Sequence, residues 1–245
     1  MNEIVFRDLG TIEYGAAWQI QEELLKKNLA LKAEAYKSPV KILPEETGTE
    51  NHLLFCTHPN VLTLGKSGHR EHLLLSDSRL KELGISFYNT NRGGDITYHG
   101  PGQVVGYPVL DLELFFTDLG RYMRSLEEVI IRTLAHYNIA AGRLQGAAGV
   151  WLDAEIPGRA RKICAMGVRC SRWITIHGFA LNVNTDLRYF GYIVPCGIGD
   201  KAVTSMQQEL GGEIDEAEVK KIIRREFETV FEATITEAKA TASLS

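Results

Sequence analysis

Apolar and polar residues follow two distinct periods along this chain, and each period predicts a type of secondary structure. A period near 3.6 residues predicts helices at 14–31, 78–83, 117–137 and 213–231. Short runs that alternate or are continuously apolar predict strands at 4–9, 52–56, 61–64, 85–88, 103–110, 150–152, 162–168 and 173–183. Residues 37–51 are rich in turn formers and acidic residues, which indicates an exposed loop.

The order of these elements indicates the fold class. Strands come in pairs and runs, and helices interrupt them irregularly, which favours an α+β fold with a mixed or antiparallel sheet. No internal repeat or low-complexity linker divides the sequence. We therefore expect residues 1–245 to form a single catalytic domain, in which the small-residue stretch 236–245 is a frayed tail.

Composition narrows the functional classes. The 245 residues are 44% hydrophobic and 24% charged, as in an ordinary soluble globular protein. A net charge of −4 gives no support for nucleic-acid binding, although a local basic patch for an acidic protein partner stays compatible with it. The first ten residues lack the pattern of a signal peptide, and no apolar run reaches the length of a membrane span. These features predict a cytoplasmic protein with no membrane attachment.

The chain contains four cysteines with no C-x-x-C pair and no disulfide-scaffold spacing: Cys56, Cys164, Cys170 and Cys196. Cys196 stands in the loop-forming sequence P-C-G, which can leave a thiol open to a ligand. A free thiol is only roughly 3% ionised at neutral pH and needs help to react. Lys162, 34 positions upstream, would give that help as a neutral base or as a charge that stabilises the thiolate. Buried cysteines that only pack are the common alternative, and we assign Cys164 and Cys170 to it.

A second feature is the segment 92–103, R-G-G-D-I-T-Y-H-G-P-G-Q, which has four glycines within eleven residues. Glycine permits positive φ and a close approach of a ligand to the main chain. A structural turn that happens to carry polar residues explains the same pattern. The segment alone does not identify a reaction or a ligand.

Common nucleotide, hydrolase and metal motifs are incomplete. L-G-K-S at 64–67 resembles the end of a P-loop, but the first required glycine is Asn60. G-I-G at 197–199 lacks the third glycine of a dinucleotide fingerprint, and no G-x-S-x-G occurs. Histidines and cysteines show no zinc spacing. We expect no metal and no cofactor, and any bond that the protein makes would draw on an activated donor such as a thioester.

Four blocks of sequence together resemble the lipoyl(octanoyl) transferases, often called LipB. They are the glycine-rich segment at 92–103, R-K-I-C-A-M-G-V-R at 161–169, H-G-F-A-L-N-V at 177–183 and I-V-P-C-G-I at 193–198. Their order and the lysine-to-cysteine spacing are those of the family. The resemblance covers about residues 50–210 closely and the flanks loosely.

The resemblance implies a function and a fold. These enzymes transfer an octanoyl group from octanoyl-acyl carrier protein to a specific lysine of lipoyl domains, in E2 subunits of 2-oxoacid dehydrogenases and in the glycine-cleavage H protein. This is the first step of endogenous lipoate biosynthesis and needs no cofactor. The family's fold is a mixed sheet with flanking helices, similar to the biotin and lipoate protein ligases. We expect a monomer.

The resemblance also implies the site residues. Cys196 would carry the acyl group as a thioester, and Lys162 would lower the pKa of its thiol and serve as a base for the acceptor amine. The remaining implied residues line the acyl pocket: Arg92, Gly93, Gly94, Asp95, Ile96, Thr97, Tyr98, His99, Ala165, Met166, Gly167, Gly178, Phe179 and Ala180.

Three other functions stay open at this point. An ATP-dependent lipoate or biotin ligase would need no cysteine nucleophile. A non-catalytic module that binds lipoyl domains or acyl carriers would have no reason to keep both Lys162 and Cys196. A cysteine hydrolase normally uses a histidine partner and admits water. The role of His177, the strictness of chain-length choice and the resting protonation of Lys162 stay undecided.

Overall fold

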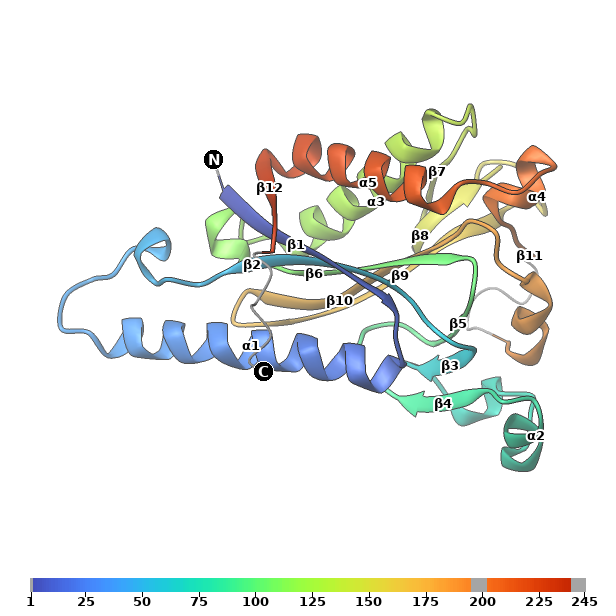
Figure 1. The fold of residues 1–245 in the computed structure, drawn as a ribbon, viewed down its shortest axis with the longest axis horizontal. Coiled ribbons are helices and arrows are strands. Elements are labelled where there is room, and N and C mark those ends of the chain that lie inside the picture. The colour runs from blue at the N-terminus through green and yellow to red at the C-terminus, as the bar shows by residue number, and fades with distance from the viewer. Residues whose placement is uncertain (1, 195–201, 239–245) are drawn as a thin grey trace, which may run out of the picture.

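The structure is a computed structural model that describes residues 2–194 and 202–238. Within these residues the chain forms a nine-stranded mixed sheet and a separate three-stranded sheet, with helices on both faces of the larger sheet (Figure 1). The α+β class and the mixed sheet expected from the sequence pattern are confirmed.

The larger sheet has the strand order β12-β1-β2-β6-β10-β9-β8-β7, and β11 pairs with β9 beside this path. Its strands are β1 (Asn2–Thr11), β2 (Asn51–Thr57), β6 (Gln103–Val109), β7 (Gly142–Leu144), β8 (Ala147–Leu152), β9 (Arg161–Ser171), β10 (Ile174–Asn182), β11 (Ala202–Val203) and β12 (Ala233–Glu237). The smaller sheet has the order β4-β3-β5 and consists of β3 (Val61–Leu64), β4 (Ser86–Asn89) and β5 (Ile96–His99).

The α-helices are α1 (Tyr14–Lys37), α2 (Asp77–Glu82), α3 (Leu119–Ala135), α4 (Met206–Leu210) and α5 (Glu216–Phe231). Four short 3-10 helices connect other elements: η1 (Pro44–Glu46), η2 (Arg70–His72), η3 (Leu112–Leu114) and η4 (Leu187–Tyr192). In the part of the chain that is described, no helix has both the length and the apolar composition required to cross a bilayer.

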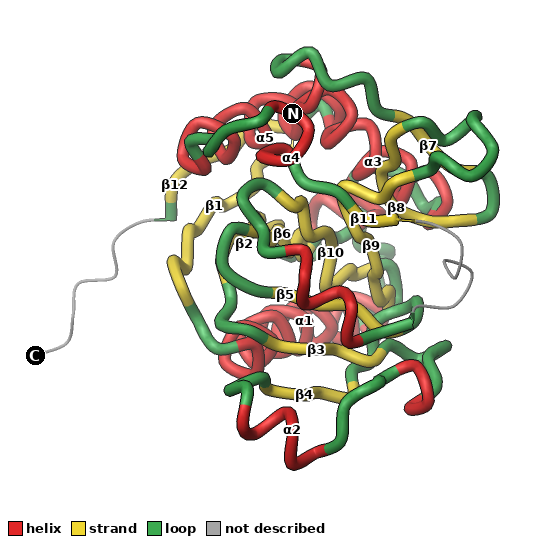
Figure 2. The backbone as a smooth tube through the Cα atoms, turned by 90° about the vertical axis from the view of Figure 1, so that its right-hand side faces the viewer, coloured by secondary structure: helices red, strands yellow, loops and turns green. Residues whose placement is uncertain are grey.

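The larger sheet separates two helical layers. Helices α3 and α5 cover one face and α1 runs along the other, and Figure 2 shows the sheet end-on between them. Because both faces are covered, all seven residues of β6 are buried. We call the buried cluster between the sheet and α3 and α5 the main core; its members include Ile4, Phe55, Leu126, Val150, Ile163, Cys164, Phe179 and Phe227.

Several elements differ from the sequence prediction. Helix α1 ends at Lys37 rather than Leu31 because its last turns are made of good helix formers and are fixed by a buried ion pair. Strand β12 runs to Glu237, so it includes the first two residues of the predicted tail, where it pairs in parallel with β1. Strands β5, β7 and β11 were not predicted: β7 and β11 have only three and two residues, and β5 lies within the glycine-rich segment.

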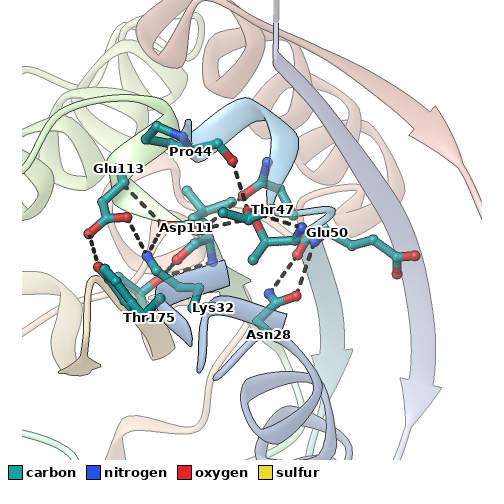
Figure 3. A network of polar contacts seen from close by, with 12 residues as sticks. Asn28, Lys32, Pro44, Thr47, Glu50, Asp111, Glu113 and Thr175 are labelled. Carbon is teal, nitrogen blue, oxygen red and sulfur yellow. Dashed lines mark hydrogen bonds and ion pairs between the residues drawn. The ribbon is translucent and has the colours of Figure 1, made fainter. Parts of the chain in front are cut away.

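A buried polar network fixes the C-terminal half of α1 to the sheet (Figure 3). The Lys32 ammonium, 1% exposed, forms ion pairs with Asp111 at 2.8 Å and with Glu113 at 2.9 Å. The Thr49 hydroxyl donates to the second oxygen of Asp111 at 2.9 Å. A buried charge must be paired and hydrogen-bonded, and Asp111 meets both requirements. The helix is thereby held in one direction, and its N-terminal end reaches the cavity described next.

Candidate active site

A cavity of about 750 Å³ opens between the larger sheet and the segment 92–99 of the smaller sheet. Most of the residues that the sequence assigned to an acyl pocket line it together: Arg92, Gly94, Asp95, Ile96, Thr97, His99, Ala165, Met166, Gly167, Gly178, Phe179 and Ala180. The glycine-rich segment and the two motifs of β9 and β10 therefore meet in space. A cavity of this size and mixed lining is typical of a small-ligand site.

Gly93 and Tyr98, from the same assignment, are not part of the lining. The Tyr98 ring stacks on Tyr189 with centroids 4.9 Å apart, and its hydroxyl donates to Asn60 at 2.8 Å. Burial raises the pKa of Tyr98. The Gly93 N–H donates to the Val168 carbonyl of β9 at 2.9 Å and joins the segment to the sheet.

Small residues on neighbouring strands form the floor of the cavity. In the antiparallel pair β9–β10, Ala165 lies opposite Ala180 and Gly167 lies opposite Gly178. A Cβ on Gly167 would be 2.6 Å from the Gly93 carbonyl oxygen. Glycine at 167 therefore permits the segment 92–94 to approach the sheet closely.

A β-bulge turns Lys162 toward the cavity. Val150 of β8 pairs with Cys164 of β9, but the next residue, Trp151, pairs with Lys162. Ile163 is the extra residue, and both Ile163 and Cys164 belong to the main core. In a regular strand Lys162 would share the face of Cys164. The bulge instead puts Lys162 in the cavity lining, on the side of Ala165 and Gly167.

Cys196 lies outside the described residues. The residues on either side of its segment, Val194 and Ala202, both line the cavity that contains Lys162. Val203 of β11 pairs in parallel with Lys162.

The other three thiols, Cys56, Cys164 and Cys170, are unsuited to nucleophilic chemistry. Burial raises the pKa of each of them, and Cys164 is fully buried in the main core. The prediction that Cys164 packs is confirmed, and Cys170 is half-buried.

One part of the cavity lining, which we call the polar end, is formed by Tyr14, Arg92 and His99. Tyr14 comes from the start of α1, and burial raises the pKa of Tyr14 to about 12. Burial also lowers the pKa of His99 well below its usual value. The Arg92 guanidinium donates to the Thr63 carbonyl at 2.7 Å and its hydroxyl at 2.9 Å. Arg92 is thus the cation that the described residues supply to this end.

His177 also lines the cavity, in a left-handed backbone conformation with φ of 61°. The backbone N–H of His177 donates to the side-chain oxygen of Gln21 in α1 at 2.8 Å. The Asn91 amide donates to Glu22, which directs the Asn91 oxygen at His177 Nε2, 2.6 Å away. Nε2 therefore carries the proton, and burial lowers the pKa of His177 to about 3. His177 is a neutral ring held at the cavity wall; its part in catalysis stays open.

Sequence reasoning missed several lining residues. Tyr14 was seen only as the start of a helix, and Tyr107 only as part of a buried strand. The β7–β8 turn, residues 144–148, forms one side of the cavity, and its Q-G pair was an available turn signal. The described residues contain no group of three or more histidine, cysteine or acidic side chains arranged to hold a metal ion.

Comparison with known proteins identifies the family. The model of the lipoyl protein ligase A/B catalytic domain matches residues 13–228. An octanoyltransferase of Flavobacterium johnsoniae is 55% identical over 95% of this chain and 98% of its own length. An octanoyltransferase of Cytophaga hutchinsonii is 51% identical over 95% of this chain and 94% of its own length.

Solved structures agree in fold. A bipartite lipoate protein ligase of Thermoplasma acidophilum superposes with a TM-score of 0.70 at 16% identity, covering 98% of this chain and 87% of the ligase chain. A lipoate-protein ligase A bound with ATP gives 0.65 at 17% identity, covering 98% and 89%. The fold is that of a lipoate ligase catalytic domain. The chain belongs to the lipoyl protein ligase A/B catalytic domain family, and these octanoyltransferase relatives identify it as an acyltransferase.

Proposed function

We propose that this acyltransferase moves an octanoyl group from octanoyl-acyl carrier protein to a specific lysine of a lipoyl domain, with Cys196 as nucleophile and Lys162 as its partner. The acceptors are E2 subunits of 2-oxoacid dehydrogenases and the glycine-cleavage H protein. The enzyme acts as a monomer in the cytoplasm and needs no cofactor.

The observation that carries the proposal is that Lys162 lines the same cavity as the two residues that flank the segment of Cys196. Val194 and Ala202 line the same cavity, and Cys196 follows Val194 by two residues, a stretch that spans at most about 7 Å. Since burial raises the pKa of each of the other three thiols, Cys196 is the cysteine left for the reaction.

The reaction then has two balanced steps. The Cys196 thiolate attacks the carbonyl carbon of the donor thioester, a new C–S bond forms, and the donor's C–S bond breaks to release the carrier's thiolate, which takes a proton from the Lys162 ammonium. The acceptor amine next attacks the acyl-enzyme, a C–N bond forms, and the Cys196 C–S bond breaks. Lys162, neutral after the first step, takes the proton that the amine loses, which restores the Lys162 ammonium and the Cys196 thiolate. Exchange of one thioester for another is close to thermoneutral, and amide formation from a thioester is downhill, so no ATP is required.

The cavity suits an acyl chain of moderate length. Each buried methylene contributes about 0.8 kcal/mol, so a floor of alanine and glycine pairs on β9 and β10 would bind the chain along its length. The polar end formed by Arg92, Tyr14 and His99 gains nothing from further methylenes. A chain that stops short of this end is therefore favoured.

The test is octanoyl transfer to an isolated lipoyl domain, measured as a mass increase of the domain, with octanoyl-acyl carrier protein and no ATP. We expect transfer by the wild type and none by Cys196→Ser or Lys162→Met. A matched control is Cys170→Ser, at a thiol outside the cavity lining, which should keep wild-type activity. Transfer from free octanoate only when ATP is added would instead identify a ligase, and no transfer under either condition would contradict both.

A further inference from the structure

Trp151 of β8 lies directly against the proposed catalytic lysine. Trp151 and Lys162 are opposite one another in the antiparallel β8–β9 pair, and Lys162 Nζ lies 4.5 Å from the centroid of the indole ring. A cation at this distance over an aromatic face is attracted by the ring's π electrons, and tryptophan gives the strongest attraction. The ring is fully buried, so little water weakens the interaction.

The bulge at Ile163 creates this contact. Without it, the residue opposite Trp151 would be Ile163, and Lys162 would face the main core. Gly149, with φ of 107°, belongs to the same structure, since a Cβ there would lie 2.4 Å from the Cys164 carbonyl oxygen. The backbone on both strands is therefore shaped so that the indole and the ammonium meet.

The charged groups on the neighbouring elements have partners of their own. Asp153 of the loop after β8 and Glu209 of α4 both bind the Arg161 guanidinium. Glu127 of α3 binds Arg143 and accepts the Gly149 N–H. Cys164 lies on the opposite face of β9 in the main core. The contact between Lys162 and the indole is separate from these pairs.

We propose that Trp151 is a positioning residue, which holds the Lys162 side chain as an ammonium at the cavity wall. This role rests on the proposed function. The indole favours the charged form of Lys162 and fixes its direction, so Lys162 rests as an ammonium that can serve as the counter-charge of the proposed Cys196 thiolate. Lys162 then gives its proton to the carrier's thiolate and, once neutral, accepts the proton of the acceptor amine.

The test compares Trp151→Leu, which removes the ring, with Trp151→Phe, which keeps a weaker one. We expect Trp151→Leu to lower kcat about five- to thirtyfold, the range of a desolvated cation–π contact, with KM within about twofold. The pH midpoint for alkylation of Cys196 by iodoacetamide should rise by about 0.7–1.5 units, because the thiolate loses its fixed counter-charge. Trp151→Phe should restore most of both quantities.

Two controls separate positioning from simple loss of structure. Trp173→Leu, at a tryptophan outside the cavity lining, should leave both quantities unchanged. In a Lys162→Met background, Trp151→Leu should cause no further loss of the remaining alkylation rate, since the partner is already absent. An equal loss in that background, or a pH midpoint that does not move in Trp151→Leu, would overturn the proposal.

The contact can also be measured without activity, which separates this proposal from the proposed function. In a protein whose other tryptophans are replaced, Trp18→Phe and Trp173→Phe, fluorescence reports Trp151 alone. Lys162→Met should shift its emission maximum, and the exposed Lys66→Met should not. An unchanged emission overturns the contact even if octanoyl transfer is observed, whereas a shift without transfer would leave the contact standing and contradict only the proposed function.

Discussion

Replacing Lys32 by methionine should destabilise the fold strongly while leaving the chemistry of the site intact. Lys32 is 1% exposed and Asp111 is fully buried, so the substitution leaves a carboxylate without its cation in the protein interior. Removing one partner of a buried pair typically costs about 3–5 kcal/mol. Asp111 keeps hydrogen bonds from the Thr49 hydroxyl and the Glu113 N–H, so we expect the lower end, about 3 kcal/mol of unfolding free energy.

The assay is urea unfolding at pH 7, with Lys27→Met as the matched control on the same helix. Lys27 pairs with Glu50 at the surface, where both side chains are about half exposed, so its loss should cost less than about 1 kcal/mol. Adding Asp111→Asn to Lys32→Met should recover part of the stability, since the fully buried carboxylate is then removed. Eighteen residues of α1, about 27 Å, separate Lys32 from Tyr14 in the cavity, so kcat/KM of the folded variant should stay within about twofold.

A result in which Lys32→Met costs no more than Lys27→Met would refute this reasoning, because a fully buried charge would then tolerate the loss of its partner. A large fall in kcat/KM with unchanged stability would also contradict it. That pattern would mean that the far end of α1 acts on the reaction and not on the fold.

Two further predictions concern the cavity itself. Ala165→Leu adds the volume of about three methylenes to the cavity floor. At about 0.8 kcal/mol per displaced methylene, this should lower octanoyl transfer by about 50-fold, while butanoyl transfer falls less than threefold in the same assay. Equal losses for both chains would contradict binding of the acyl chain over Ala165. Buried His177 stays neutral in the folded state because its pKa is about 3, against roughly 6.5 in the unfolded chain. Its contribution to the unfolding free energy is therefore complete above about pH 6.5 and is lost as the pH falls toward 3. Between pH 7 and 5 the wild type should lose about 2 kcal/mol more unfolding free energy than His177→Asn does, whereas His69→Asn, at an exposed histidine, should behave as the wild type.

The elements that could be predicted from sequence are those with a long, regular pattern. Helices α3 and α5 and the strands β6 and β10 follow from local periodicity, because each buries a continuous face. Strand β12 could not be predicted, since its five residues become a strand only by pairing with β1 at the other end of the chain. Strand pairing of this kind depends on tertiary context rather than on local sequence.

The same limit applies to the site. Most of the residues that the motifs assigned to an acyl pocket lie in the cavity lining, because each motif lies on a single strand or segment. Alternation alone, however, puts Lys162 on the face of Cys164, and only the pairing with Trp151 reveals the bulge that reverses it. Tyr14 is part of the lining for a similar reason: the direction of α1 is fixed at its opposite end, by Lys32.

The most direct test of the central claim is intact-protein mass spectrometry after incubation with octanoyl-acyl carrier protein in the absence of ATP and acceptor. We predict an octanoyl adduct that hydroxylamine removes, that Cys196→Ser abolishes and that Cys170→Ser retains. An adduct that resists hydroxylamine, or that survives in Cys196→Ser, would contradict a thioester on Cys196 and with it the proposed mechanism.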